Sequence, residues 1–257
     1  MQNVINLSST TPAAPAGRNN VLWQNDSSTP PNVSAYVPFK FCRRLISGGN
    51  PITFTPTFSA LNGLTTWAAC LWINVLNYVS SATNASVSIG TSGSAQVGFF
   101  STGESGTAFW TSVGSGGTVY YNMTGWANGA NMCGWYFTAI TCTSNAVSIY
   151  WKSYSAATLT AGGTGTASAL STATTGVIAN SSPVVCFDVH DVMFFSQALT
   201  QANFLSIAST PANASSIAGS NLKFWAPLNG SNPETDSSGN GYSCSTMDPW
   251  VALLSLS

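Results

Sequence analysis

The chain has 257 residues, 44% of them hydrophobic, which is enough for one large β domain with extensions or two small domains. Only 5% of the residues are charged, about a fifth of the usual share, and the formal net charge is −1. These values exclude nucleic acid as a partner, because phosphate binding needs clustered Lys and Arg, and only Arg43 and Arg44 are adjacent. A surface with so little charge suits a subunit that becomes buried in an assembly.

Targeting signals and cysteine motifs are not apparent in the sequence. The start, MQNVINLSST, has neither a basic nor an apolar region of the kind that signal peptides carry. No apolar run approaches the roughly 18 residues of a membrane span, so we expect no membrane partner. The cysteines show no C-x-x-C and no zinc-like spacing, which favours free buried thiols over disulfides. They are Cys42, Cys70, Cys133, Cys142, Cys186 and Cys244.

Strand signals dominate from the first third of the chain onward. Residues 1–38 contain five prolines and little periodicity, which predicts an extended arm within an attachment segment, 1–47. Short runs rich in β-branched and aromatic residues then predict strands within 67–79, 96–103 and 107–125.

The clearest feature is the hairpin GWYFTAITCTSNAVSIYWKSY at 134–154. Its first arm alternates Trp135 and Phe137 with Tyr136 and Thr138, as a strand with two different faces does. The turn TSNA follows, and the return arm again alternates, with one face formed by Val147, Ile149 and Trp151.

Residues 153–182 are nearly all Ser, Thr, Ala and Gly, and they allow two interpretations. One is a long flexible loop, and the other is a single polar strand flanked by loops. After them, CFDVHDVMFF (186–195) predicts a closing strand, and QALTQANFLSIAS (197–209) is the only segment that predicts a helix. Thr200 would be its N-cap. The residues available for burial are Phe204, Leu205 and Ile207.

Regularly spaced strands with almost no helix predict an all-β fold, an antiparallel β-sandwich of the jelly-roll type, over residues 48–210. We expect 211–257 to be a C-terminal strand and turn segment that packs on the sandwich or on a neighbouring subunit. Its tail, VALLSLS, would be an aggregation liability if it were exposed.

Three of these stretches together resemble the concanavalin A-like, laminin-G-type lectin/glucanase sandwich over roughly residues 48–208. TTWAACLWINV is similar to the early core strand of that family, and GWYFTAITCTSNAVSIYW to its central hairpin. FDVHDVMFFSQALTQANF is similar to its closing strand and helical turn. The sequence departs from the family at WKSYS, where the commonest form has an Asn-Gly dipeptide.

Ionisable side chains are most concentrated in the stretch D-V-H-D, where the only histidine, His190, lies between Asp188 and Asp191. On a regular strand Asp188 and His190 share one face. Asp191 then points to the other face with Val189 and Met193, so the three cannot converge unless a bulge intervenes. We predict a structural role for this cluster. The family resemblance implies that Asp191 hydrogen-bonds into the adjacent loop.

Catalytic signatures are missing from the sequence. Glycoside hydrolysis needs two carboxylates at a set separation, which the sandwich glucanases carry as E-x-D-x-x-E. Here the glutamates are Glu104 and Glu234, and only Asp236 lies near Glu234. There is also no G-x-S-x-G elbow to accompany His190. We therefore expect no enzyme and name no catalytic or cofactor-binding residue.

Calcium stays a candidate ion without named ligands, since it needs six to eight oxygens and the turn ETDSSGNG is also an ordinary turn formula. The acids outside Glu104 are Asp26, Asp188, Asp191, Glu234, Asp236 and Asp248. Sugar binding would instead use aromatic faces. We expect Trp67, Trp72, Trp135 and Trp151 in the core. The tryptophans left for a ligand or, in preference, a subunit contact are Trp23, Trp110, Trp126 and Trp250.

The two ends carry a second resemblance. NLSSTTPAAPAGRNNVLWQNDSSTPPNVSAYVP resembles N-terminal segments of tailed-bacteriophage structural proteins, and LKFWAPLNGSNPETDSSGNGYS is similar to a segment of such virion proteins. We predict a non-enzymatic virion protein, assembled in the host cytoplasm, as a tail fibre or adhesin, a capsid decoration or an internal tail part. Its partners would be other virion subunits in a homo-oligomer and, further, a host-surface glycan. The alternatives are a free-standing carbohydrate-binding lectin and then a glycoside hydrolase.

Overall fold

The structure is a computed structural model, and it divides the chain into two units, 1–33 and 34–257. The fold described below belongs to the second unit. The structure describes residues 42–45, 52–55, 59–75, 85–89, 97–101, 110–113, 134–167, 169–170, 177–178, 187–229 and 234–244. The predicted arm, 1–38, and the tail VALLSLS lie outside these residues.

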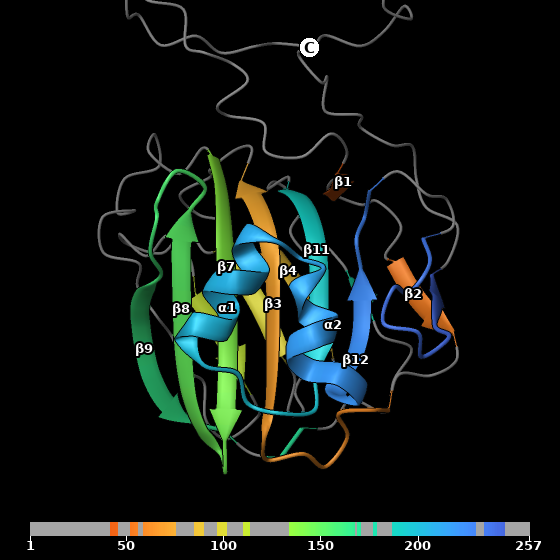
Figure 1. Cartoon of the computed structure of the whole chain (residues 1–257), viewed down its shortest axis with the longest axis horizontal. Helices are drawn as coiled ribbons and strands as arrows, with labels where there is room; N and C mark the ends of the chain where they lie inside the picture. Colours follow the sequence, from red (N-terminus) through yellow and green to blue (C-terminus); the bar gives the residue numbers. More distant parts are fainter. Residues whose placement is uncertain are drawn as a thin grey trace, which may run out of the picture. The chain divides into compact units, whose positions relative to one another are not determined.

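Seven strands form the first antiparallel sheet, in the order β1-β11-β3-β7-β8-β9, and β12 also pairs with β11 (Figure 1). The edge of β11 away from β3 is shared, because β1 pairs with its first half and β12 with its second half. The segment 1–47, expected to be an attachment arm, therefore includes one strand of this sheet, β1. The strands are β1 (Arg43–Leu45), β3 (Trp67–Val75), β7 (Gly134–Thr143), β8 (Ala146–Ser153), β9 (Thr160–Thr166), β11 (Phe187–Phe195) and β12 (Leu222–Ala226).

The predicted hairpin is confirmed as β7 and β8, which pair from Thr143 and Ala146 to Tyr136 and Ser153. Its two loop residues, Ser144 and Asn145, both have positive φ, 49° and 68°. Two such residues make a type I′ turn, whose twist matches that of the two strands. Of the two interpretations of 153–182, the polar strand is correct for Thr160–Thr166, because this segment pairs with β8 as β9.

The second sheet has six strands in the order β13-β2-β10-β4-β5-β6, and all pairings among its described residues are antiparallel. Strand β4 lies behind the first sheet in Figure 1, on the side away from the helices. The predicted antiparallel β-sandwich is thereby confirmed. The strands are β2 (Ile52–Thr55), β4 (Ala85–Ile89), β5 (Val97–Ser101), β6 (Trp110–Val113), β10 (Val177–Ile178) and β13 (Ser243–Cys244).

Two helices cover the front of the first sheet: α1 (Gln201–Ser209) and α2 (Asn213–Ala218), the latter followed by the 3₁₀ turn η3 (Gly219–Asn221) (Figure 1). The predicted N-cap of α1 is confirmed. The Thr200 hydroxyl accepts a hydrogen bond from the Asn203 backbone N–H, and the Thr200 backbone N–H donates to the Asn203 side chain. Helix α2 was not predicted, since its six residues, NASSIA, are too few to show a period.

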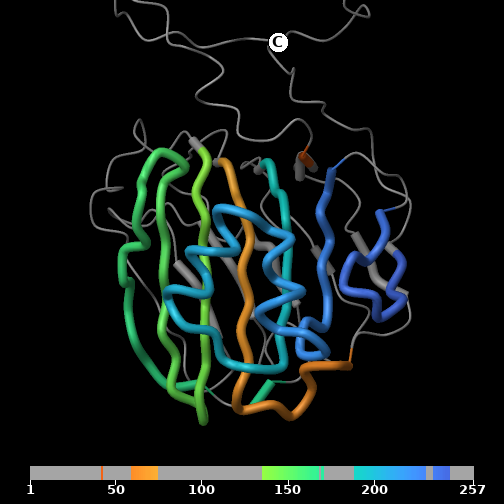
Figure 2. Tube along the Cα trace, viewed as in Figure 1, coloured from red at the N-terminus to blue at the C-terminus, as the bar shows by residue number. Residues whose placement is uncertain are grey.

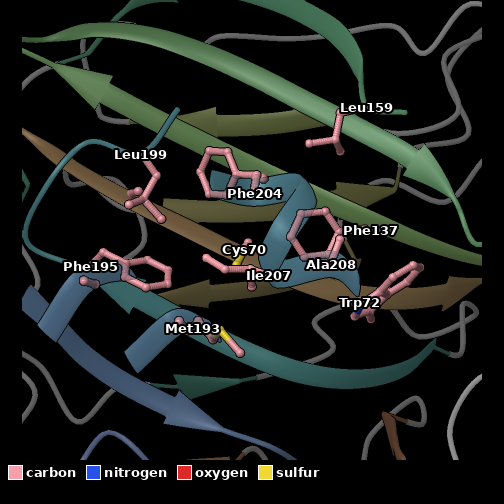
Figure 3. Close-up of a cluster of buried hydrophobic side chains, with 14 of the residues drawn as sticks. Cys70, Trp72, Phe137, Leu159, Met193, Phe195, Leu199, Phe204, Ile207 and Ala208 are labelled. Carbon is pink, nitrogen blue, oxygen red and sulfur yellow. The ribbon is translucent and has the colours of Figure 1, made fainter. Parts of the chain in front are cut away.

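The core under α1 is built from alternate residues of β3, β7 and β11 (Figure 3). Phe204 of α1 is fully buried, and its ring centroid lies 6.5 Å from that of Phe137 and 6.0 Å from that of Tyr150. On the other face of β3, Trp67, Ala69, Leu71 and Ile73 are fully buried, so both faces of this part of the strand are covered. The expected core positions of Trp67, Trp72 and Trp135 are confirmed, whereas Trp151 is only half-buried.

Candidate functional site

The D-V-H-D segment contains a β-bulge. In the pairing of β11 with β3, His190 lies opposite Trp72 and Met193 lies opposite Cys70, so two residues of β11 face the single residue Leu71. The first bulged residue, Asp191, has a φ of 51°. The bulge lies where the outer partner of β11 changes from β1 to β12. The backbone N–H of Asp191 donates to the carbonyl of Pro227, just beyond β12, at 3.2 Å.

The bulge corrects the predicted side-chain directions. Because one extra residue is inserted, Met193 shares the face of His190 and not that of Val189. It also brings two members of the cluster together, since His190 Nδ1 donates to Asp191 Oδ2 at 2.7 Å. Asp191 Oδ1 accepts a second hydrogen bond, from Trp225 Nε1, at 2.8 Å. Asp191 therefore links β11 to β12, close to the hydrogen-bonding role that was expected of it.

Asp188, the third member, is fully buried and faces the neighbouring strand β3. The Asn74 amide nitrogen lies 3.5 Å from Asp188 Oδ2, and the two residues are directly paired in the register. Asp188 and Asp191 thus hydrogen-bond to different elements. The arrangement braces the sheet.

Glu234 and Asp236 also hydrogen-bond to the backbone (Figure 2, deepest blue, beside β12). Asp236 Oδ1 accepts from the backbone N–H groups of Trp225 and Ser238, at 3.0 and 2.9 Å. Buried Glu234 accepts from the N–H of Leu228 at 3.0 Å, and Leu228 has a φ of 55°, which is strained for a bulky side chain. These acids hold the C-terminal turn against β12, which is the structural use of a D-S-S-G sequence.

The described cysteines Cys42, Cys70 and Cys142 are buried free thiols, as predicted. Burial raises the pKa of the Cys70 thiol well above its usual value, and the nearby Asp191 carboxylate raises it further. A thiol reacts as its thiolate, so both effects make Cys70 inert.

We expect Cys70 to resist alkylation by iodoacetamide at pH 8 in the native protein and to react fully in denaturant. Peptide mass spectrometry of the labelled protein measures this directly. Native-state modification of Cys70 as fast as that of a free thiol peptide would contradict the burial described above.

A row of aromatic side chains with one lysine crosses the helix-bearing face next to the core. Trp72 and Phe137 are paired neighbours in β3 and β7, and Phe137 pairs with Lys152 of β8. The Trp72 ring lies 5.5 Å from Phe137 and 5.9 Å from Tyr154, centroid to centroid. In Figure 3 Trp72 lies at the end of the labelled cluster. Sequence reasoning missed Lys152, although its alternation with Tyr150 and Tyr154 placed it on a face with aromatic residues.

Charge is nearly absent from the described surface. Every Asp, Glu, Lys and Arg side chain that the structure describes is buried or half-buried, and none is exposed. Four are buried, and two are half-buried. They are Lys152, Asp188, Asp191 and Glu234, followed by Lys223 and Asp236.

Several predicted residues lie outside the side chains that the structure describes. Within the described part of the chain, no group of three His, Cys, Asp or Glu side chains could hold a metal ion. No helix there is long and apolar enough to cross a membrane. The residues outside are Trp23, Asp26, Glu104, Trp110, Trp126, Cys133, Cys186, Cys244, Asp248 and Trp250.

Comparison with known proteins gives distant likenesses in structure alone. No protein-family model and no curated protein matches the chain. It is similar to the native heptameric SAP-like pentraxin from Limulus polyphemus, with 11% identity over 82% of this chain and 98% of that one, and a TM-score of 0.44. It is similar to the binding domain of botulinum neurotoxin DC in complex with SialylT, with 16% identity over 68% of this chain and a TM-score of 0.47.

The chain spans 44% of the length of that toxin chain. A GH43 protein from Bacillus licheniformis is also similar, with 12% identity over 49% of this chain and 26% of that one, and a TM-score of 0.32. At these identities and TM-scores, the likenesses assign the chain to no family.

Proposed function

We propose that this chain is a non-enzymatic structural protein of a bacteriophage virion, in which the β-sandwich is a contact module between subunits. The observation that carries the proposal is the absence of an exposed charged side chain from the described surface. Monomeric soluble domains usually stay apart by means of surface charge. A surface of Ser, Thr, Asn and Gly instead suits a subunit that is stabilised by association.

The role of the acids supports the non-enzymatic part of this proposal. Asp191, Glu234 and Asp236 each accept hydrogen bonds that hold β12 or the segments next to it. An acid that is committed to N–H donors of the protein itself is poorly placed to exchange protons with a substrate. Neither a catalytic pair nor a nucleophile with its base is found among the described side chains.

A lectin remains the second candidate function, and Tyr154 is the observation that favours it. This residue is the one large hydrophobic side chain on the described surface that is exposed, at 44%. Exposed aromatic rings bind apolar surfaces such as the faces of sugar rings. Glycan contact and subunit contact can belong to the same virion protein.

Two tests address the virion assignment. Genes that encode capsid or tail proteins beside the gene for this chain would support it, and metabolic-enzyme neighbours would count against it. Deletion of residues 1–38 tests the attachment role of the arm. We expect the full chain to form trimers or larger oligomers and the truncated chain to be insoluble. A truncated chain with the solubility and mass of the full chain would show that the arm takes no part in assembly.

A further inference from the structure

Lys152 is an unusual lysine, because its side chain is buried on the helix-bearing face of the first sheet. The residue is only 7% exposed. Its Nζ lies 5.8 Å from the ring centroid of Trp72, a cation–π geometry. Within the part of the chain that the structure describes, it has no hydrogen bond and no ion pair. Burial lowers the pKa of the ammonium group, as expected for a cation that has lost water without gaining an anion.

The described carboxylates all lie toward the opposite edge of the first sheet from Lys152. Asp188 and Asp191 belong to β11, which is separated from β8 by β3 and β7. Three strand spacings correspond to about 14 Å, too far for an ion pair. Asp236 hydrogen-bonds to Trp225 of β12, and Glu234 hydrogen-bonds to Leu228, just after β12. Strand β12 lies on the far side of β11 from β8. Figure 1 shows β8 and β12 toward opposite edges of the sheet, with β7, β3 and β11 between them. The charge of Lys152 is therefore not compensated by a described acid.

Tyr154, two residues further along the chain, is the exposed member of this cluster. Tyr154 is 44% exposed, and its ring packs edge-on against Trp72, the ring that also contacts Lys152. Trp72 is itself buried, and it contacts both the ammonium group and the tyrosine ring.

We propose that Lys152 and Tyr154, positioned by Trp72, form a binding site for a carboxylate-bearing sugar, such as a terminal uronic or sialic acid. The ammonium would pair with the carboxylate in a charge-assisted hydrogen bond. The exposed ring would stack on the apolar face of the sugar.

The composition of the site selects this ligand class over other anions. A polyphosphate or nucleic acid needs several cations, and the other described lysine, Lys223, is on β12. A peptide carboxylate would satisfy Lys152 but would leave Tyr154 without a defined partner. An acidic sugar uses the single cation and the aromatic face together.

This inference does not depend on the assembly role, because the site lies within one chain. A monomer that binds acidic sugars would remove the proposed function and leave the site intact. An oligomer that binds no acidic sugar would remove the site and leave the proposed function intact.

The test is isothermal titration calorimetry of the full-length chain with two oligosaccharides, one ending in glucuronic acid and one in sialic acid. Each is compared with its carboxyl-reduced form. We expect at least one acidic form to bind, and its reduced form to bind about tenfold more weakly or worse, as the loss of a charge-assisted hydrogen bond implies. This comparison uses only the wild-type protein.

Three variants localise the binding. Lys152→Met keeps the apolar stem on Trp72 and should fold normally, yet weaken binding of the acidic form by about tenfold or more. Tyr154→Ala should weaken the acidic and reduced forms alike. Lys223→Met, which removes a lysine whose Nζ donates to the Ser220 carbonyl, should leave binding unchanged. The site is overturned if neither acidic sugar binds, if the reduced forms bind equally well, or if Lys152→Met binds like wild type. Preference for peptide carboxylates over both sugars would also overturn it.

Discussion

Replacing Asp191 with Ala should lower the free energy of unfolding by about 3 kcal/mol, a large part of the stability of an ordinary domain. The substitution leaves Trp225 Nε1 and His190 Nδ1 without their shared acceptor in a buried setting. It also places alanine at a φ of 51°. An apolar residue with a β-carbon costs about 1 kcal/mol more in this left-handed conformation than Asn or Asp does. Urea unfolding monitored by tryptophan fluorescence measures the change.

Two further variants separate the hydrogen bonds from the backbone strain. Asp191→Asn keeps an acceptor for Trp225 and tolerates the left-handed conformation, so it should lose only about 1 kcal/mol. Asp191→Gly relieves the strain but not the loss of acceptors, and it should fall between Asn and Ala. If Asp191→Ala unfolds at the same urea concentration as wild type, Asp191 does not brace β11 against β12.

Replacing Phe204 with Ala should cost about 3–5 kcal/mol, because it removes a fully buried ring from the contact between α1 and the sheet. The ring meets Phe137 and Tyr150, whose strands are fixed by the β7–β8 hairpin and cannot easily move inward to fill the space. Calorimetric or urea unfolding gives the value.

Leu205, the next residue of α1, is the matched control. It is half-buried and packs at the border of the same cluster, so Leu205→Ala should cost only about 1 kcal/mol. Equal losses for Phe204→Ala and Leu205→Ala would mean that α1 does not present Phe204 to the sheet as described.

Local features of the fold could be predicted from the sequence. The alternation in 134–154 and its two-residue turn specify a hairpin without reference to the rest of the chain, since each strand buries one set of side chains. Thr200 identifies the start of α1 because its hydroxyl caps a helix only four residues before the first core side chain, Phe204. These signals act over short distances along the chain.

The bulge at Asp191 could not be located in this way. It depends on the change of edge partner from β1 to β12, and these strands lie far apart in the sequence. A shift of one residue reverses the faces of every later side chain, which is why Met193 was assigned to the wrong face. The polar strand β9 was similarly undecided, because Gly, Ser and Thr show no apolar period and only pairing with β8 defines it.

The candidate site was only partly predictable for the same reason. A lone histidine between two aspartates attracts attention in a sequence, yet these residues brace the sheet. Lys152 looks like an ordinary surface lysine in the sequence. Its importance arises from the neighbouring strands, which place Trp72 beside it and every described acid far from it.

The central claim is that this sandwich, whose described surface has no exposed charged side chain, is a subunit of an assembly. The mass of the purified full-length chain in solution tests it most directly. Sedimentation velocity over a hundredfold range of protein concentration gives that mass without a matrix. The account predicts trimers or larger oligomers that persist at the lowest concentration. A single species with the 26.6 kDa mass of one chain at every concentration would contradict it.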